Sequence, residues 1–405
     1  MKKLAILGIV ALLLVMGLAV VAPAPVGAQT TWHVYPGDSI QAAIDAASTD
    51  DTIIVHEGTY TEDLTISAAK TNLELKPADG DAVTIQGVAT VLETNYPLCD
   101  PNINIIADGV KVHGFTIEHP DTTPGTNYAS GMVVGAENVE ISDNAFQVAH
   151  WSQGIQTWRD ANSPNDNIAG LNIHDNAFTH KGDPVGGAHG YVGVWINHST
   201  VTTGTVTIQD NVFTGDIIQG IYSERDNSTI QGNSLITDMG TTASHFGIGI
   251  GDYDGRAQSN VLITDNTVEG FQWGMRIGRS GQTLTNISVH KNTVDDNGIG
   301  IQVRSSDTDV AIHHNAVTGN DGDGISLAGD TDSIHHNTVT GNGGDGISVA
   351  GDSDSIHHNT VTDNGGYGIH LTATSHDNTV HHNTLSGNTA GEINNEGTNN
   401  KVFKN

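Results

Sequence analysis

The sequence repeats itself near its C-terminal end with a shift of 22 residues, and this repetition limits the fold more than any other feature. The segment 332–340 (DSIHHNTVT) recurs letter for letter as 354–362. The same shift carries the Gly-Ile pair at Gly324 onto Gly346 and then onto Gly368. A unit of this size cannot bury an apolar face alone, so the repeats are expected to stack on one another.

An asparagine closes each copy of the repeat. Its spacing varies between 22 and 35 residues in the middle of the chain and settles at 22 to 24 near the end. We therefore expect regular coils at the C-terminal end and coils with inserted loops in the middle. An amide side chain at a corner bonds the coils on either side, so the asparagines predict a structural ladder and no catalysis. They are Asn144, Asn176, Asn211, Asn233, Asn266, Asn292, Asn315, Asn337, Asn359, Asn383 and Asn405.

Short alternating stretches such as Val206–Ile208 indicate several strands per repeat, each with one buried face. The prediction is an all-β, single-stranded parallel β-helix with coils about 4.8 Å apart. Residues 39–47 form the clearest helix pattern, with Ser39 as N-cap. This helix is expected to cap the N-terminal end of the apolar interior.

The first 28 residues have the pattern of a signal peptide: Lys2 and Lys3, an apolar run, then Val26-Gly27-Ala28. A transmembrane anchor is the alternative, which Pro23 and Pro25 disfavour. The predicted division is 1–28 signal peptide, 29–120 capping helix and first coils, 121–300 central coils with loops, and 301–405 regular coils. Residues 29–405 would be one continuous domain, secreted or cell-surface, without membrane insertion after cleavage.

The net charge and the cysteine content limit which partners and which covalent cross-links are expected. Asp and Glu number 46 against 15 Lys and Arg, a formal charge of −31, which repels nucleic acid. Cys99 is the single cysteine, so no disulfide forms within the chain. The last residues, 401–405, show no cap, which leaves end-to-end self-association open.

These repeats resemble the pectin-lyase-like right-handed β-helix superfamily, which includes the NosD group. Residues 40–47 (IQAAIDAA) and 53–60 (IIVHEGTY) are similar to the N-terminal part of pectin methylesterases and polysaccharide lyases. The resemblance implies a right-handed helix and a carbohydrate ligand. The paired-Asp motifs of pectin methylesterases and polygalacturonase-type hydrolases and the Asp-Pro-His motif of alginate epimerases are missing, so it implies no catalytic apparatus.

One face of the central coils departs from the repeat. Trp195, Tyr222 and Arg276 share an outward strand position, and Trp151 and Trp273 stand in or beside the preceding loops. Exposed aromatic rings suit the C–H faces of sugars, and Arg suits carboxylates. The sequence therefore predicts a polysaccharide or cell-surface glycan as partner. The alternative is that these residues pack the loops onto the coil.

Two sets of residues could carry catalysis, and the sequence leaves open whether the protein is an enzyme. Lys181, His189, Tyr191 and Arg225 are the candidates for a polysaccharide lyase. Glu224 and Asp252 are the candidate carboxyl pair of a glycoside hydrolase.

The repeated His-His pairs are candidate ligands of Cu, Ni or Zn, represented by His313, His335 and His357. Neighbouring strand residues point to opposite sides, so both rings of a pair converge only if a corner intervenes. A polar surface ladder is the alternative.

The repeated aspartates are candidate calcium ligands, so Ca²⁺ is a candidate cofactor, although the sequence establishes none. They are Asp330, Asp332, Asp352 and Asp354, which should stack on successive coils. Solvated turns are the alternative. The leading hypothesis for the chain is a secreted carbohydrate-binding β-helix, with a non-catalytic envelope scaffold or a NosD-like metal-associated protein as rivals.

Overall fold

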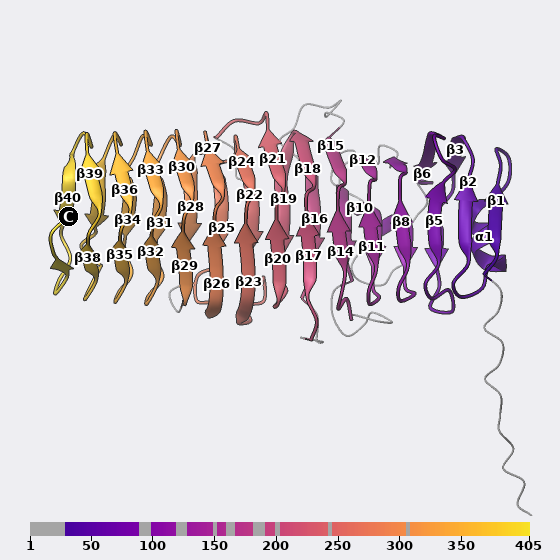
Figure 1. Cartoon of the computed structure of the whole chain (residues 1–405), viewed down its shortest axis with the longest axis horizontal. Coiled ribbons are helices and arrows are strands. Elements are labelled where there is room, and N and C mark those ends of the chain that lie inside the picture. The colour runs from indigo at the N-terminus through magenta and orange to yellow at the C-terminus, as the bar shows by residue number, and fades with distance from the viewer. Residues whose placement is uncertain are drawn as a thin grey trace, which may run out of the picture.

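The computed structural model describes residues 29–88, 99–118, 128–148, 152–158, 167–180, 191–198, 203–241, 245–304 and 308–405. In these residues the strands form three parallel sheets of 15, 13 and 13 strands. Successive coils lie side by side along the long axis of the molecule in chain order (Figure 1). The predicted right-handed parallel β-helix is confirmed.

The first sheet takes one strand from nearly every coil. Its order is β1 (Thr31–Val34), β2 (Thr52–Val55), β5 (Glu74–Pro77), β8 (Lys111–His113), β11 (Glu140–Ser142), β14 (Asn172–His174), β17 (Val206–Gln209), β20 (Ser228–Gln231), β23 (Gln258–Thr264), β26 (Leu284–His290), β29 (Val310–His313), β32 (Ser333–His335), β35 (Ser355–His357), β38 (Thr379–His381) and β41 (Lys401–Val402).

The second sheet precedes the first within each coil. Its order is β4 (Leu64–Ile66), β7 (Cys99–Ile105), β10 (Tyr128–Val134), β13 (Ser152–Thr157), β16 (Tyr191–Ile196), β19 (Ile217–Ser223), β22 (Phe246–Ile250), β25 (Trp273–Ile277), β28 (Ile299–Val303), β31 (Ile325–Leu327), β34 (Ile347–Val349), β37 (Tyr367–Leu371) and β40 (Gly391–Asn395).

The third sheet follows the first. Its order is β3 (Gly58–Thr61), β6 (Val83–Gln86), β9 (Thr116–Glu118), β12 (Ala145–Val148), β15 (Ala177–His180), β18 (Val212–Gly215), β21 (Ser234–Thr237), β24 (Thr267–Glu269), β27 (Thr293–Asp295), β30 (Ala316–Thr318), β33 (Thr338–Thr340), β36 (Thr360–Thr362) and β39 (Thr384–Ser386).

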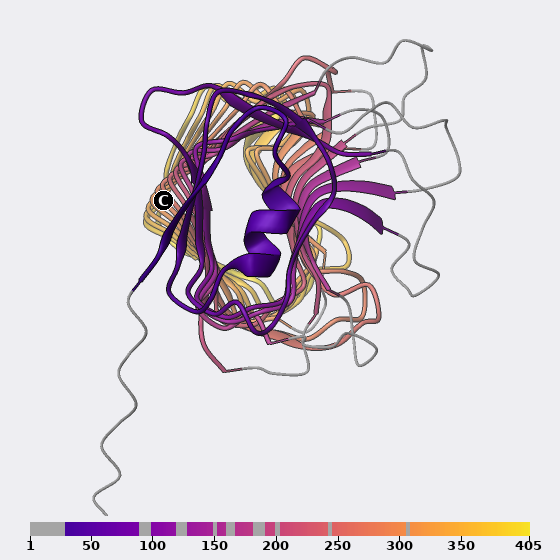
Figure 2. The same cartoon turned by 90° about the vertical axis from the view of Figure 1, so that its right-hand side faces the viewer.

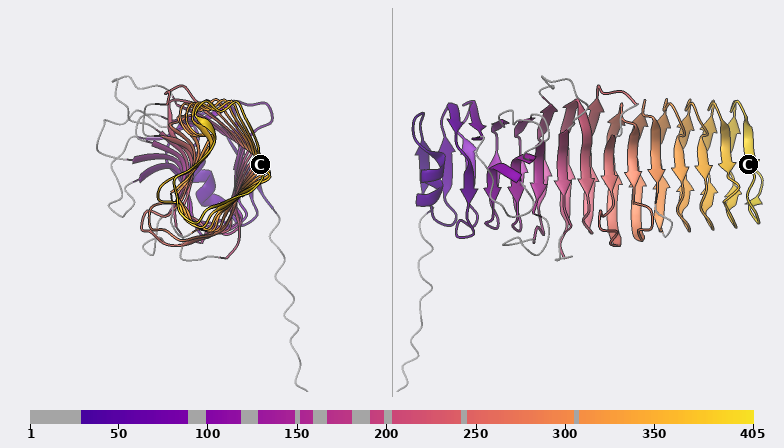
Figure 3. Two further views of the ribbon diagram at one scale, coloured as in Figure 1. Left: turned by 90° about the vertical axis from the view of Figure 1, so that its left-hand side faces the viewer. Right: turned by 180° about the vertical axis from the view of Figure 1, so that it is seen from behind.

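Strand register aligns equivalent side chains from coil to coil, so the interior consists of files of like residues. Ile312 pairs with Ile334, which pairs with Ile356, and all three are fully buried. End views down the axis show successive coils superposed around this interior (Figures 2 and 3). Apolar burial along these files is the main stabilising term of such a fold.

The Gly-Ile motif marks a place where backbone and core meet closely. A Cβ on Gly346 would collide with a Val361 methyl of the same coil and with the Gly368 carbonyl of the next coil. The φ of Gly346 is not in the left-handed region, so close approach and not backbone conformation requires glycine here.

The predicted asparagines form a continuous file at the corner between the first and third sheets. The Asn315 amide donates to Asn337 Oδ1 at 3.0 Å, and the Asn337 amide donates to Asn359 Oδ1 at 3.0 Å. Each side chain also accepts the backbone N–H of the preceding asparagine, for example Asn315 N to Asn337 Oδ1 at 3.0 Å. All of these amides are buried. The file thus satisfies polar groups that the corner would otherwise leave unpaired.

A second asparagine file, which the sequence analysis missed, occupies the corner between the third and second sheets. Its side chains are hydrogen-bonded in the same way, with amide-to-oxygen distances of 2.8 to 3.1 Å. Its members are Asn297, Asn320, Asn342, Asn364 and Asn388. A mixed file of Asp332, Asp354, Asn378 and Asn400 occupies the third corner.

The helix α1 (Ile40–Ala46) lies across the N-terminal end of the stack (Figure 2). Ser39 accepts the Ala42 N–H, and Glu62 accepts the Ile40 N–H at 2.7 Å, so the first turn is capped from both sides. Ile40 and Ile44 are fully buried. That the helix acts as a cap on the interior stays a prediction. Among the described residues, no helix combines the length and the apolar character needed to span a bilayer.

Candidate functional site

Strand register brings the predicted aromatic and arginine residues into one file on the second sheet. Trp195 pairs with Tyr222, Tyr222 with Gly249, and Gly249 with Arg276. Four successive coils therefore contribute to one lateral strip, in which Gly249 separates the aromatic residues from the arginine.

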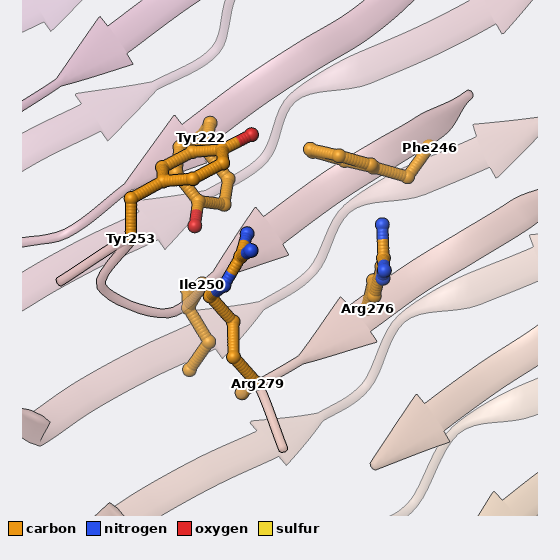
Figure 4. Close-up of a pocket in the computed structure, with 7 residues that line it drawn as sticks. Tyr222, Phe246, Ile250, Tyr253, Arg276 and Arg279 are labelled. Carbon is orange, nitrogen blue, oxygen red and sulfur yellow. The ribbon is translucent and has the colours of Figure 1, made fainter. Parts of the chain in front are cut away.

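A pocket opens beside this file, and we call it the aromatic–arginine pocket (Figure 4). It encloses about 230 Å³, part of which is open to solvent. The lining comes from β19, β22 and β25 and from the loops that follow β22 and β25. The lining residues are Tyr222, Phe246, Ile250, Tyr253, Arg276, Gly278 and Arg279.

Tyr222 lies in the predicted file, but its ring is only 4% exposed, which corrects the expectation of a row of exposed rings. The loop after β22 folds over it: the Tyr253 ring lies 5.3 Å from the Tyr222 ring, and the Tyr222 hydroxyl donates to the Gly251 carbonyl. Burial raises the pKa of Tyr222, with smaller raising effects from Tyr253 and Glu224, and nearby Arg279 opposes them. The exposed ring at this place is Tyr253, at 41%.

Both arginines lie against aromatic rings and not against carboxylates. The Arg279 guanidinium carbon is 4.1 Å from the centroid of Tyr253, and that of Arg276 is 4.7 Å from the centroid of Trp273. Within the described part of the chain, neither guanidinium forms a salt bridge. Two cationic groups without a carboxylate partner, in a protein with a formal charge of −31, form a local positive site.

Trp195 and Trp273 extend the aromatic surface on either side. The Trp195 ring lies 6.0 Å from Tyr222 in an edge-to-face arrangement and 5.8 Å from Tyr253. Trp273, at the start of β25, is partly exposed and supports Arg276. Trp151 lies outside the described residues.

The candidate hydrolase carboxyls are buried. Asp252 has no exposed surface; its Oδ1 accepts the Asp254 N–H at 2.7 Å, and its Oδ2 lies 3.4 Å from His198 and 3.7 Å from Arg256. Burial lowers the pKa of His198, and Arg256 lowers it further. Glu224 is 2% exposed. A carboxyl that protonates a glycosidic oxygen must reach it, and neither group reaches the surface in this structure.

Only two of the four candidate lyase residues, Tyr191 and Arg225, fall within the described residues. Arg225 is 1% exposed and donates to the Thr203 carbonyl at 3.1 Å. Tyr191 begins β16, while Lys181 and His189 lie outside the described residues. The catalytic roles of all these residues stay predictions.

The four candidate calcium ligands accept hydrogen bonds from the backbone of neighbouring coils. Asp332 Oδ1 accepts the Val310 N–H at 2.8 Å and Asp354 Oδ1 accepts the Asp332 N–H at 2.8 Å. Asp330 Oδ1 accepts the Asp352 N–H at 2.9 Å, and Asp352 Oδ1 accepts the His376 N–H at 2.7 Å. Burial raises the pKa of Asp332 to about 7 and that of Asp354 to about 8. Calcium binding there stays a prediction.

The His-His pairs form two parallel files of imidazoles, because a corner does intervene. The second histidine of each pair has a left-handed backbone, with φ between 56° and 58°, so both rings of a pair point to the same side. Rings within each file stack at centroid distances of 4.8 to 5.3 Å. Burial, together with the neighbouring histidines, lowers the pKa of His335 and of His357 to about 4. The described residues contain no group of three or more His, Cys, Asp or Glu arranged to hold one metal ion.

The sequence analysis missed Tyr253 and the role of Arg279 in the pocket. Both stand in loops that interrupt the repeat, and their side chains reach the file only through loop conformation. The one signal was the long spacing of 33 residues between Asn233 and Asn266, which marks an insertion in this coil.

Comparison with known proteins agrees with the architecture. Residues 249–404, less than half of the chain, match the family described as periplasmic copper-binding protein (NosD). A search of curated proteins finds no sequence match.

Several solved structures are similar over most of the chain. The A-module of the mannuronan C-5 epimerase AlgE4 of Azotobacter vinelandii is 14% identical, with 90% of this chain and 94% of that chain covered and a TM-score of 0.53. A mutant tailspike protein of the E. coli bacteriophage HK620 is 11% identical, with 87% and 75% covered and a TM-score of 0.58. The Dettilon tailspike protein is 16% identical, with 91% and 68% covered and a TM-score of 0.51. At these identities the likeness shows the fold alone: this chain is a right-handed parallel β-helix protein.

Proposed function

We propose that this protein binds an acidic polysaccharide on the lateral surface of its central coils, outside the cell or in the cell envelope. The aromatic–arginine pocket carries the proposal. It offers the exposed ring of Tyr253 beside two guanidinium groups, Arg276 and Arg279, that lack a carboxylate partner among the described residues. An aromatic face suits the C–H face of a sugar ring, and a guanidinium suits its carboxylate.

The geometry of the coils suits a polymer. Pocket residues come from β19, β22 and β25, on adjacent coils about 5 Å apart, so a chain of sugars can lie along the axis across several coils. Three proteins with the same fold support this reading: one is named as a mannuronan C-5 epimerase, and two are named as tailspike proteins.

The proposed location rests on the pattern of residues 1–28, which has the charged, apolar and small-residue parts of a signal peptide. A polysaccharide ligand agrees with that location. Catalysis is not part of the proposal, because the candidate carboxyls Glu224 and Asp252 are both buried.

Calorimetric titration tests the proposal with an oligo-uronate and with a neutral oligosaccharide of the same length. The formal charge of −31 opposes the approach of a polyanion, so short oligomers at about 0.15 M salt, where the Debye length is about 8 Å, give the clearest result. We expect the oligo-uronate to bind and the neutral oligomer to bind at least tenfold more weakly.

Two variants locate the site. Arg276→Gln should weaken oligo-uronate binding at least tenfold, about 1.4 kcal/mol, because it removes the partner of the carboxylate. Tyr253→Ala should weaken both oligomers by removing the ring. Arg304→Gln, which makes the same charge change just after β28 and outside the pocket lining, is the matched control and should stay within twofold. The proposal is wrong if neither oligomer binds, or if the Arg276 and Arg304 variants lose the same affinity.

A further inference from the structure

The outward face of the second sheet changes from covered to open at the aromatic–arginine pocket. On the N-terminal side of the pocket, the outward file of side chains consists of Val133, Gln156, Trp195 and Tyr222. Val133, Gln156 and Tyr222 are buried, so other parts of the chain cover the sheet there. From Arg276 to the last strand of the sheet, every residue of the file is partly exposed. The open direction from the pocket therefore runs toward the C-terminal coils.

The outward side chains next to the pocket change from basic to uncharged within one coil. The two guanidinium groups of the pocket, Arg276 and Arg279, belong to the coil of β25. Strand β28 of the next coil places Gln302 beside Arg276 and Ile299 beside Trp273. Both side chains are partly exposed and uncharged. An amide and an apolar side chain offer hydrogen bonding and contact area to a sugar without attracting a charge.

The following two coils add carboxylates to the open face. The outward file continues through Ser326 and Ser348, and Asp323 and Asp345 each stand three residues before the serine of their coil. Asp323 Oδ1 accepts the Asp345 N–H at 2.8 Å, and both carboxylates are partly exposed. The face is therefore basic at the pocket, uncharged on the next coil and acidic on the two coils beyond.

The coil of β37 carries the last partly exposed aromatic ring of this face. Tyr367 and His370 have ring centroids 5.3 Å apart, and the Tyr367 N–H donates to Asp345 Oδ1 at 2.7 Å. Nδ1 of His370 lies 2.7 Å from Asp345 Oδ2, and its Nε2 lies 3.7 Å from Glu396. One imidazole thus faces two carboxylates, so the acidic character of this region persists even when His370 is protonated.

We propose that the ligand of this site is a glycan whose acidic sugar is at one end of the bound stretch, with uncharged sugars in the rest of it. This inference rests on the proposed function and names the substrate more closely. The acidic end occupies the aromatic–arginine pocket, where a guanidinium pairs with its carboxylate. The uncharged sugars cross the coils of β28, β31 and β34, which are three steps of about 4.8 Å, or roughly 14 Å in all.

The acidic coils explain why the remaining sugars are uncharged. A carboxylate accepts hydrogen bonds from sugar hydroxyl groups, so Asp323 and Asp345 suit neutral sugars. A second uronate on these coils would instead lie near the two carboxylates, and like charges roughly 5 Å apart repel each other. A chain of uronates therefore gains a charge pair at the pocket and loses affinity on the coils that follow.

The covered side of the pocket explains why the acidic sugar is terminal. An inner uronate reaches the guanidinium groups only if a further sugar extends toward Tyr222 and Gln156, where the chain already covers the sheet. Steric exclusion on that side and repulsion on the other side thus select the same order of sugars. Neither effect depends on catalysis.

Calorimetric titration with a set of tetrasaccharides tests this order. Two of them carry a single uronate, at the non-reducing end or at the reducing end. A third carries the single uronate at an inner position, and a fourth carries a uronate at every position. We expect one of the two end-labelled tetrasaccharides to bind at least tenfold more tightly than the inner-labelled and the fully acidic ones.

A double variant tests the acidic coils separately. Asp323→Asn/Asp345→Asn removes both charges and keeps each Oδ1 that accepts a backbone N–H. The ratio of the affinities for the end-labelled and the fully acidic tetrasaccharide should fall at least fivefold. Asp210→Asn/Asp265→Asn makes the same charge change at exposed left-handed corners between the first and third sheets, which Asn tolerates. This matched control should leave the ratio within twofold of the wild type.

The inference is overturned if the fully acidic tetrasaccharide binds as tightly as the better end-labelled one. It is also overturned if the Asp323/Asp345 variant, folded by circular dichroism, keeps the wild-type ratio. If that variant does not fold, the comparison of tetrasaccharides on the wild-type protein decides alone. Failure of the proposed function gives a different result: none of the four tetrasaccharides binds, or Arg276→Gln weakens none of them.

Discussion

The central coils and the C-terminal coils share one backbone architecture but differ in what occupies their corners. In the coils from β29 onward, each of the three corners carries a file of Asn or Asp side chains that bond from coil to coil. In the central coils, the file of Asn176, Asn211 and Asn233 continues at one corner, while the loops after β22 and β25 occupy another. The aromatic–arginine pocket stands at that corner.

The difference suggests how one fold combines stability with binding. Side-chain files fix a corner tightly and leave no room for an insertion, since each amide must meet its partner in the next coil. Where a file is missing, the corner accepts a loop that can hold a ligand-binding residue such as Tyr253. The interior differs as well: Phe146, Phe178 and Phe213 stack in the central coils where the C-terminal coils have valines.

The largest effect is expected when the shared asparagine file is broken. Asn337→Ala removes an amide that donates to the Ile312 carbonyl at 2.8 Å and to Asn359 Oδ1 at 3.0 Å, and it deprives the buried Asn315 N–H of its acceptor. Asn359 Oδ1 keeps only the Asn337 backbone N–H as a donor from this residue. We expect a loss of roughly 3–5 kcal/mol in the free energy of unfolding of these coils, measured by denaturant titration and hydrogen exchange.

The same change in the central region sharpens the comparison. Asn176→Ala breaks the same bonds there and should cost a similar amount. Thr338→Ala, at an exposed neighbour, is the control and should change stability by less than about 0.5 kcal/mol. Equal and small effects of all three changes would contradict a structural role of the file.

An intermediate effect on stability is expected when the buried side chains of one region are replaced by those of the other. Phe178 stacks on Phe146 at 4.7 Å and on Phe213 at 4.6 Å, and it is fully buried. Phe178→Val gives this coil the filling of the C-terminal coils and leaves a cavity, which should cost roughly 2–3 kcal/mol by thermal or denaturant unfolding. The reverse exchange, Val339→Phe, should cost roughly 1–3 kcal/mol through overpacking. If either exchange is neutral, the two interiors are interchangeable and the comparison fails.

The smallest effect is a gain in stability at the third corner of the C-terminal coils. Burial, together with the negative charges of Asp332, Asp330 and Asp352, raises the pKa of Asp354 to about 8. A folded pKa above the unfolded value means that the stabilising contribution is complete below about pH 4 and is lost as pH rises through about 8. Asp354→Asn, which resembles Asn378 in the same file, should stabilise these coils by roughly 1–2 kcal/mol at pH 8.

The pH dependence of stability distinguishes the titration of Asp354 from a general effect of removing one negative charge. The gain in stability of Asp354→Asn over the wild type should grow from pH 4 to pH 9. Thermal unfolding at each pH measures this difference. The control Asp363→Asn removes one charge from an exposed corner that is not among the charges raising the pKa of Asp354, so the pH dependence of its stability difference should be smaller. A constant difference across this range would exclude titration of Asp354 as the cause.

The sequence predicted the parts of the structure that repeat. Identical letters at a shift of 22 residues required stacked coils, and the asparagine at each copy marked one corner. The second file, which includes Asn342 and Asn364, escaped notice because asparagines beside glycines have the appearance of ordinary turns. The outward file of Trp195, Tyr222 and Arg276 followed from strand position alone.

What could not be predicted depends on loops and on backbone conformation at single residues. The burial of Tyr222 results from the path of the loop that carries Tyr253, and no repeat encodes that path. The rings of His335 and His336 point to the same side because His336 has a left-handed φ of 56°. The amino-acid sequence alone does not specify this backbone conformation. Predicting either feature requires the three-dimensional path of the backbone.

Hydrogen exchange with and without a bound oligo-uronate tests most directly that the corner without a side-chain file is the binding site. Binding should slow exchange in the loops 251–257 and 278–283 and leave the corresponding C-terminal corners, 329–332 and 351–354, unchanged. Protection centred on the C-terminal corners, or no protection in the two loops at saturating ligand, would contradict this account.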